Sequence, residues 1–363
     1  MKLRFLPPKQ REIALFDASG LEEARGILKK GKYEIIYCRK ENINIFVLIK
    51  AILKRNLFFK KIDYYNQYLK EINPKILITF NDNNYLFYKL DKDNIHSISV
   101  QNGSRSYHND ILETFKQLKK RIKINNYFVF NKSFQKELSK FIDTKFFSLG
   151  SAINNNFKKR NYNFTNTALY LSPFSYSTYS QFKKNKRKFY EFYQKEINFL
   201  KEINFELKKR NIKLSILGKL RDHNKSIEKE FYKLSGIKYI ENYKKRKTFD
   251  IASKFEILIG YSSSTLTYEM LAREKKVIVL NRNYNYYPFT TKKFGYFDSL
   301  ADEGVFWINS GNKIKFMNLF NKLKKMTKLD WQINLKKYEK FTCEFNYLNM
   351  KLKNHIKNIL KSY

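Results

Sequence analysis

The chain has 363 residues, of which 43% are hydrophobic, so it can form one large or two ordinary domains and is not intrinsically disordered. Five prolines and eleven glycines exclude collagen-like and low-complexity classes, and two cysteines, Cys38 and Cys343, exclude a disulfide scaffold or cysteine-rich zinc module. The 73 Lys and Arg against 33 Asp and Glu give a formal net charge of +40.

This excess of positive charge has two explanations, and composition leaves both open. One is a polyanionic partner, such as nucleic acid, an anionic membrane surface or a nucleotide-activated substrate. The other is a bias toward Lys, Asn, Ile, Phe and Tyr, which AT-rich codons encode. Local clusters of basic residues are therefore more informative than the total.

Extended and helical patterns alternate along the first half of the chain. Helices are expected at 21–30 and 43–54, and strands at 12–16, 33–37, 75–80, 97–100, 127–130 and 145–149. Strands that are apolar throughout and separated by helices are typical of a parallel, doubly wound sheet.

The second half repeats the pattern after a polar, Asn-rich stretch at 154–166, which we interpret as a linker. Helices are expected at 188–210, at 313–325 and after Asp330, and strands at 167–171, 213–217, 255–259 and 276–280. The predicted fold class is α/β, with two Rossmann-like domains facing across a cleft and a C-terminal helical tail. The expected boundaries are 1–155 and 156–330 for the domains and 331–363 for the basic tail.

A hydroxyl-rich turn follows the strand expected at 255–259. It contains Ser262, Ser263, Ser264 and Thr265, and a helical pattern begins directly after it. Ligands bind beyond the carboxyl ends of parallel strands, and a helix N-terminus with adjacent hydroxyls offers hydrogen-bond donors to a phosphate. Glu269, one helical turn further on, is placed to accept hydrogen bonds from a ribose diol. Ser and Thr are also common helix N-caps, so a purely structural role stays open.

Residues 257–281, which include this turn, resemble the donor-site segment of GT-B-fold glycosyltransferases. The similarity is greatest to bacterial surface-carbohydrate enzymes: Kdo transferases, sialyl- and polysialyltransferases, and CDP-glycerol phosphotransferases. It implies that the Ser-Thr turn grips the phosphate of a CMP- or CDP-linked donor and that Glu269 binds the ribose. Residues 80–88 and 100–105 resemble the N-terminal half of surface carbohydrate biosynthesis proteins. The N-terminal domain is then the acceptor side, and the C-terminal domain binds the nucleotide sugar.

The loop after the strand at 213–217 departs from that resemblance. Sialyltransferases of this kind carry a His-Pro pair in this place, whereas the chain has no His-Pro and instead holds Gly218, Lys219 and Arg221. Either Lys219 and Arg221 replace the pair in binding phosphate or carboxylate, or the donor is a different one. The third interpretation is that residues 218–221 form an ordinary charged loop without a binding role.

The catalytic base is expected in the N-terminal domain, where a carboxylate or histidine would deprotonate the acceptor hydroxyl. The strand-end candidates are Asp17, Asp82 and His108, although Asp is also a common turn residue. Residues that would bind the acceptor or the donor sugar are Asn81, Gln101, Asn102, Gly103 and Arg105.

Other chemistries have little support. Asp91-Lys92-Asp93 spells the D-x-D of metal-dependent glycosyltransferases, but it follows an expected helix, and the four histidines show no metal-ligand spacing. No P-loop, G-x-G-x-x-G or G-x-S-x-G motif is present. We therefore expect neither a metal site nor a cofactor beyond the nucleotide-sugar co-substrate.

The sequence thus predicts a metal-independent glycosyltransferase that moves a sugar from a CMP-activated donor to a surface glycan or lipid-linked glycan acceptor. The resemblance favours a nonulosonic acid or Kdo as that sugar. Alternatives of the same fold are a CDP-polyol phosphotransferase, a GDP- or UDP-sugar transferase and a non-enzymatic scaffold. A basic nucleic-acid-binding protein is the alternative from another class, but the chain carries no nucleic-acid-binding signature, so we expect no nucleic-acid partner.

Two basic clusters predict contact with an anionic inner-membrane surface. Residues 311–363 hold 13 lysines and three acidic residues, and a second cluster runs from Lys116 to Lys123. In that cluster Ile111, Phe115, Leu118 and Ile122 are expected to form one apolar helical face. Residues 1–10 have no apolar signal region, and the apolar patch 43–53 is too short to span a bilayer. We expect a cytoplasmic protein that binds the membrane peripherally.

Overall fold

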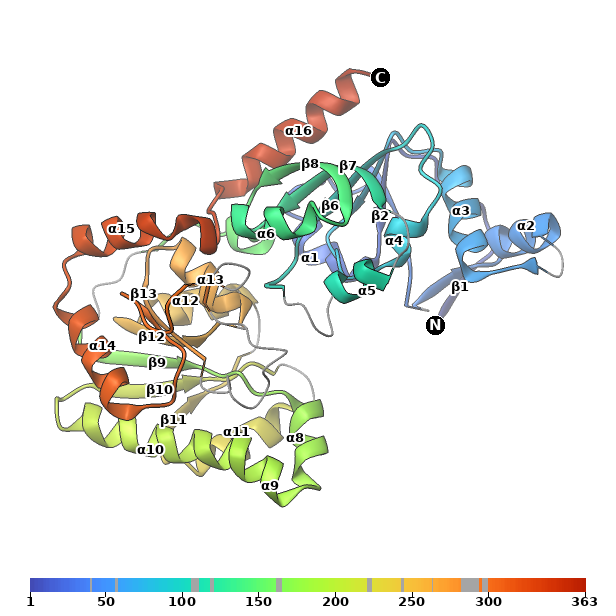
Figure 1. Ribbon diagram of the computed structural model, residues 1–363. Helices are drawn as coiled ribbons and strands as arrows, with labels where there is room; N and C mark the ends of the chain where they lie inside the picture. Colours follow the sequence, from blue (N-terminus) through green and yellow to red (C-terminus); the bar gives the residue numbers. More distant parts are fainter. Residues whose placement is uncertain are drawn as a thin grey trace. The chain divides into compact units, whose positions relative to one another are not determined.

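The computed structural model describes residues 1–39, 41–55, 58–105, 111–117, 121–160, 165–220, 224–242, 245–262, 264–281, 294–295 and 300–363 (Figure 1). The chain divides into two compact units. The first unit comprises residues 1–158 together with 344–363, and the second comprises 159–343. The first boundary lies three residues beyond the predicted one at 155.

The first unit is built on a six-stranded parallel sheet whose strand order is β3-β2-β5-β6-β7-β8. These strands are β3 (Tyr33–Ile36), β2 (Ile13–Phe16), β5 (Ile76–Thr79), β6 (His96–Val100), β7 (Ile122–Val129) and β8 (Ile142–Ser148). The neighbouring strands β2 and β5 are buried along their whole length, as their apolar sequences predict. The strand order reverses between β2 and β5, so the sheet is doubly wound.

The α-helices of the first unit that precede residue 159 lie in the connections between these strands or, for α7, directly after β8. They are α1 (Leu21–Ala24), α2 (Ile45–Arg55), α3 (Lys61–Ile72), α4 (Leu86–Lys89), α5 (Ile111–Gln117), α6 (Lys132–Leu138) and α7 (Ala152–Asn155). A small second sheet pairs β1 (Lys2–Arg4) with β4 (Asn42–Asn44), directly before α2.

The helix predicted to carry the second basic cluster is shorter than expected. Ile111 and Phe115 lie on the buried side of α5, but Ile122 and Lys123 already belong to β7, so the expectation of one helical face through Ile122 is wrong. Burial alternates from Ile122 to Asn125, which is the period of a strand and not of a helix. Residues 118–120 lie outside the described part of the chain.

The second unit is also built on a six-stranded parallel sheet, but with three strands instead of two before the reversal; its strand order is β11-β10-β9-β12-β13-β14. The strands are β11 (Lys238–Ile240), β10 (Lys213–Leu217), β9 (Thr167–Leu171), β12 (Ile257–Tyr261), β13 (Lys276–Leu280) and β14 (Trp307–Ile308). Its strand order reverses between β9 and β12. The predicted α/β class with two doubly wound, Rossmann-like units is therefore confirmed.

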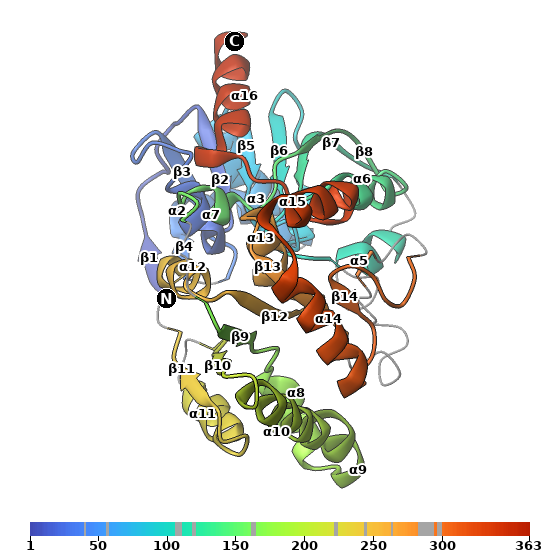
Figure 2. The same ribbon diagram turned by 90° about the vertical axis from the view of Figure 1, so that its left-hand side faces the viewer.

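Helices cover both faces of the second sheet. Figure 2 shows α10 (Lys195–Lys208) and α11 (Lys225–Lys233) on one side, with α12 (Lys245–Ser253) and α13 (Thr265–Ala272) on the other. The helix predicted at 188–210 is composite, because α9 (Lys186–Phe189) and a π-helical turn (Tyr190–Gln194) precede α10. The remaining helices are α8 (Tyr176–Lys183), α14 (Lys313–Lys325) and α15 (Lys328–Lys337).

The predicted basic tail is divided between the two units. The helix α15 belongs to the second unit, where Trp331 is buried, whereas α16 (Met350–Lys361) belongs to the first. Leu352, Ile356 and Ile359 of α16 join the same buried cluster as Ile98 of β6. The helix α16 is therefore not a separate tail, because its apolar face is part of the core of the first unit.

We predict that Leu352→Ala destabilises the first unit by about 2–5 kcal/mol, since it removes a fully buried side chain and leaves a cavity. The measurement is the free energy of unfolding from urea titration of the full chain. Lys357→Ala, on an exposed position of the same helix, is the matched control and should change that energy by less than about 0.5 kcal/mol. Equal effects of both substitutions would contradict the assignment of α16 to the core.

Candidate functional site

Polar side chains gather at the carboxyl edge of the first sheet, where its strand order reverses. Asp17 follows β2, and Asn81 follows the neighbouring β5. The Asp17 carboxylate is fully buried, and its Oδ2 accepts hydrogen bonds from Asn81 Nδ2 at 2.8 Å and Asn84 Nδ2 at 2.9 Å. The topological switch point is the usual ligand site of such sheets, so these residues stand where a binding site is expected.

The backbone at Asp17 is strained. Its φ of 73° lies in the region that non-glycine residues rarely adopt, and its Oδ1 accepts a hydrogen bond from Ser19 N at 3.0 Å. Gly20 ends this turn so close to the chain after β5 that an added Cβ would lie 2.6 Å from Phe80 Cβ. Backbone strain of this kind costs about 1–3 kcal/mol and clusters at functional sites.

The Asp17 carboxyl is held as an anion. Burial raises its pKa, but hydrogen bonds from Ser19, Asn84 and Asn81 outweigh burial, and the net pKa lies below the ordinary value. Arg39 approaches from the exposed side, with Nη2 3.5 Å from Oδ2. The site therefore consists of the Asp17 carboxylate with the long cationic side chain of Arg39 beside it.

Asp82 is the centre of a second, fully buried group of contacts. Its carboxylate pairs with Arg105 through both Nε, at 2.9 Å, and Nη2. It also accepts hydrogen bonds from the Asn102 backbone N–H at 3.1 Å and from the Tyr127 hydroxyl at 2.7 Å. Burial, followed by the Asp82 charge, raises the pKa of Tyr127, which stays protonated as a donor. These four donors occupy the lone pairs of Asp82.

Asn102 joins the two carboxylates into one network. Its Nδ2 donates to Asn81 Oδ1 at 3.1 Å, and its Oδ1 accepts from Arg105 Nη2 at 2.6 Å. Gln101 has a different role, because it donates to the Gly103 carbonyl at 2.7 Å and accepts from the Phe130 backbone N–H at 2.8 Å. Gln101 thus holds the loop that carries Asn102.

The structure brings together the predicted residues Asp17, Asn81, Asp82, Gln101, Asn102, Gly103 and Arg105. His108 lies outside the described residues. Sequence reasoning missed Asn84, Arg39 and Tyr127, which complete the network. Asn84 had a signal, since it ends the polar run after β5, but Tyr127 lies within an apolar strand and carried none.

In the second unit, the hydroxyl-rich turn stands at the corresponding reversal of strand order. Ser262 follows β12 and is buried, and Ser264 is the N-cap residue of α13. The Ser264 side chain makes no capping hydrogen bond, so this hydroxyl does not act as a helix cap in the structure. Thr265 is the first residue of the helix, and Ser263 lies outside the described residues.

The helix α13 packs closely on β12. A Cβ added at Gly260 would lie 2.3 Å from Thr267 Oγ1, so a glycine is needed at this position. Glu269 is buried one turn further on, near Arg273. Burial lowers the pKa of Arg273 to about 10, whereas the Glu269 and Asp250 charges act in the opposite direction. Glu269 therefore has a charged neighbour at the C-terminal end of its own helix.

The loop after β10 is fixed from within the second unit. Gly218 has no room for a side chain, because an added Cβ would lie 2.0 Å from the Tyr239 hydroxyl. The backbone N–H groups of Lys219 and Leu220 donate to the Glu228 carboxylate at 2.8–3.1 Å. Lys219 is exposed, and Arg221 lies outside the described residues.

Glu228 belongs to a buried polar cluster that the sequence analysis missed. It accepts a hydrogen bond from Ser172, directly after β9, and Glu196 accepts from Tyr170 at 2.9 Å and Tyr232 at 2.7 Å. A signal was available, because Glu228 shares the apolar face of its helix with residues three and four positions later. A carboxylate on an apolar helix face indicates a buried partner.

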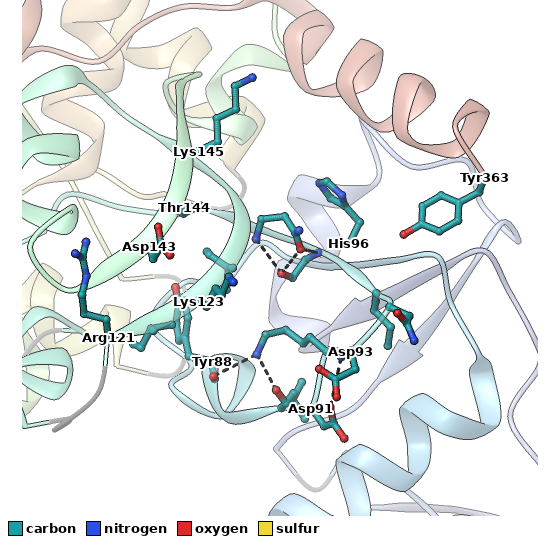
Figure 3. Close-up of a pocket in the computed structure, with 18 residues that line it drawn as sticks. Tyr88, Asp91, Asp93, His96, Arg121, Lys123, Asp143, Thr144, Lys145 and Tyr363 are labelled. Carbon is teal, nitrogen blue, oxygen red and sulfur yellow. Dashed lines mark hydrogen bonds between the residues drawn. The ribbon is translucent and has the colours of Figure 1, made fainter.

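The D-x-D stretch lies at the opposite, amino edge of the first sheet. Asp91 and Asp93 line a hollow of about 1000 Å³ that also contains His96, at the start of β6, and Asp143 (Figure 3). Lys92 Nζ donates to main-chain carbonyls in and directly after α4, including that of Leu90 at 2.8 Å. Within the described ranges, no group of three or more His, Cys, Asp or Glu side chains is arranged to hold a metal ion.

The comparisons with known proteins concern both the family and the fold. Residues 98–360 match the protein family described as "putative O-antigen biosynthesis protein". No curated protein matches the chain. Among the helices that the structure describes, none is long and apolar enough to cross a membrane.

Solved structures resemble the whole chain at low identity. A glycosyltransferase from Rickettsia africae ESF-5 is 14% identical with a TM-score of 0.52, and the match covers 98% of this chain and 100% of that one. A "putative UDP-N-acetylglucosamine 2-epimerase" from Listeria monocytogenes is 13% identical with a TM-score of 0.54, covering 98% and 96%. These likenesses show the fold, which is of the GT-B type.

We predict that Asp82→Asn destabilises the protein by about 3–5 kcal/mol, because it removes the carboxylate charge that faces the buried Arg105 guanidinium. The measurement is the free energy of unfolding in urea. Glu206→Gln, which removes the half-exposed pair with Arg210, should cost less than about 1 kcal/mol. Similar losses in both variants would show that the Asp82 pair is not the buried anchor of the site.

Proposed function

The chain belongs to this family of O-antigen biosynthesis proteins, and from that premise we propose that it is a GT-B glycosyltransferase acting on a surface glycan. The observation that carries the proposal is that each unit has a polar site at its own reversal of strand order. The first unit has a buried carboxylate network there, and the second has a hydroxyl-rich helix N-terminus. Base and phosphate-binding groups are the two requirements of nucleotide-sugar transfer.

We assign the base to Asp17. The four donors around Asp82 are divided evenly over its two oxygens, whereas at Asp17 three donors share Oδ2, and among the described residues Oδ1 accepts from Ser19. The strained backbone at Asp17 also favours a functional role there. Asp17 would accept the proton of the acceptor hydroxyl as the nucleotide leaves, and Asp82 would position Asn102 and Arg105 toward the sugar.

The second unit would hold the leaving nucleotide. The first N–H groups of α13 and the hydroxyls of Ser264 and Thr265 are donors for a phosphate, and the positive end of the helix dipole stabilises its charge. This arrangement needs no divalent metal. Glu269 and the exposed Lys219 would contribute to ribose and phosphate binding.

The donor nucleotide distinguishes the remaining possibilities. The resemblance of residues 257–281 to CMP- and CDP-dependent enzymes favours a CMP-linked sugar, whose acceptor is a glycan or a lipid-linked glycan. A UDP-sugar reaction, transfer or 2-epimerisation, is the second candidate. Two solved structures with TM-scores above 0.5 carry the name UDP-N-acetylglucosamine 2-epimerase, one of them as a putative assignment.

We predict that Asp17→Asn lowers sugar transfer by roughly a hundredfold or more, since an amide cannot accept the acceptor proton. Asn is compatible with the positive φ, but its NH2 group replaces an oxygen that accepts hydrogen bonds, so turnover is compared well below the melting temperature of the variant. Turnover is measured with a nucleotide sugar and a short glycan acceptor. Asp143→Asn, on an exposed position at the opposite sheet edge, is the control and should retain full turnover.

We also predict that CMP or CDP raises the melting temperature more than UDP or GDP does, without added divalent metal. Ser264→Ala combined with Ser263→Ala should weaken that binding about tenfold or more, because each lost hydrogen bond to a charged group is worth about 1.5–3 kcal/mol. A larger rise of the melting temperature with UDP would contradict the CMP-linked donor and favour the UDP-sugar reaction. Binding of generic RNA or DNA with no nucleotide response would favour a nucleic-acid-binding protein.

A further inference from the structure

The helix α2 is apolar on two opposite sides. Val47 and Ala51 point into the first unit and are buried. Ile49, Ile52 and Leu53 lie on the opposite side and are exposed by 52%, 42% and 71%. Their spacing of three and four residues places them on one face of the helix, so they form a contiguous apolar strip open to solvent.

Further exposed apolar side chains flank this strip. Phe58, just after α2, is 81% exposed. The strand β1 packs beside α2, and it contributes Leu3, which is 50% exposed, while Phe5 and Leu6 follow it with 68% and 79% exposed (Figure 1). Soluble monomers rarely expose so many large apolar groups on adjacent elements, and such a patch marks an interaction site.

The apolar strip has a basic border. Lys50 and Arg55 lie at its edges with side chains 46% and 58% exposed, and they pair with Glu71 and Asp63 of α3 at 3.0 and 3.2 Å. Lys54 is so close to Lys70 of α3 that a hydrogen bond and charge repulsion from Lys70 lower its pKa. Lys60 and Lys61, at the start of α3, are also exposed. The close approach of Lys54 and Lys70 concentrates positive charge beside the strip, which favours an anionic partner.

We propose that α2, with Phe58 and the segment after β1, docks the protein on an anionic lipid bilayer. Ile49, Ile52 and Leu53 enter the acyl boundary, and the lysines around them contact the lipid headgroups. Eleven residues of helix span about 16 Å, which is too short to cross a bilayer but sufficient for a helix lying in the interface. This docking is independent of the transfer reaction and requires no nucleotide.

The chemistry of the patch decides between a bilayer and a protein partner. Strong positive charge around an apolar strip complements anionic headgroups above acyl chains, and the lysine side chains are long enough to reach the headgroups while the strip is inserted. Of the surfaces expected from sequence, α16 lacks one of these parts. The apolar residues of α16 are buried in the core, so α16 offers cations without an apolar strip.

The test is co-sedimentation of the full chain with vesicles of phosphatidylglycerol and phosphatidylcholine, compared with phosphatidylcholine alone. We expect binding to the anionic vesicles that 0.5 M salt weakens but does not abolish. The variant I49S/I52S/L53S should bind on the order of a hundredfold more weakly, because three apolar side chains no longer enter the bilayer. Its melting temperature should be unchanged, since all three side chains are exposed.

A matched control changes three exposed apolar residues of the second unit, L234S/I314S/L329S, which are 58%, 68% and 65% exposed. This variant should bind vesicles as the native chain does. Equal binding by both triple variants would overturn the proposal, as would the absence of binding to anionic vesicles. Light scattering adds the remaining outcome: a native dimer that I49S/I52S/L53S converts to monomers, without vesicle binding, would make the strip a contact between copies.

Insertion itself is measured with an environment-sensitive fluorophore at Leu53→Cys. The native cysteines Cys38 and Cys343 are buried, so the label should attach at the new site. Anionic vesicles should shift its emission to the blue, whereas the same label at Ile314→Cys should not respond. An unshifted label at position 53 in bound protein would show adsorption by charge alone and contradict the insertion of α2.

Discussion

The single reversal of strand order in each parallel sheet is the constraint on which the polar chemistry of this protein depends. At a reversal, the connections after two neighbouring strands leave toward opposite faces, so the ends of these strands are not covered by a crossover helix. Asp17 and Asn81 end one such pair of strands, and Ser172 and Ser262 end the other. Residues at these four positions can therefore meet a ligand while the strands that carry them stay buried.

A charge buried at such an edge must be compensated, and the two units do so differently. In the first unit the Arg105 guanidinium neutralises Asp82, and the resulting pair orients Asn102, which leads through Asn81 to Asp17. In the second unit Glu228 is compensated by hydroxyl and backbone N–H donors. Its carboxylate thereby fixes the loop after β10, whose free N–H groups would otherwise be exposed donors.

The surface of the first unit depends on how its helices bury their apolar sides. The apolar side of α16 is satisfied by the core, whereas α2 buries one apolar side and leaves the other in water. Exposed apolar side chains of this kind reduce the free energy of unfolding only slightly. They do, however, gain free energy in any environment that removes them from water. The basic residues beside α2 make an anionic bilayer the environment that satisfies both the apolar and the charged groups.

The sequence by itself determined the α/β class, most of the strands and the polar strand-end residues, because apolar runs and the residues after them are local signals. The tertiary structure decided the partners: Asp82 with Arg105, 23 positions away, and with Tyr127, which local pattern assigned only to a core strand. The tertiary structure also placed Ile122 in β7 and α16 in the first unit. Periodicity states which side of an element is apolar, but burial and hydrogen bonding are set by contacts between distant segments.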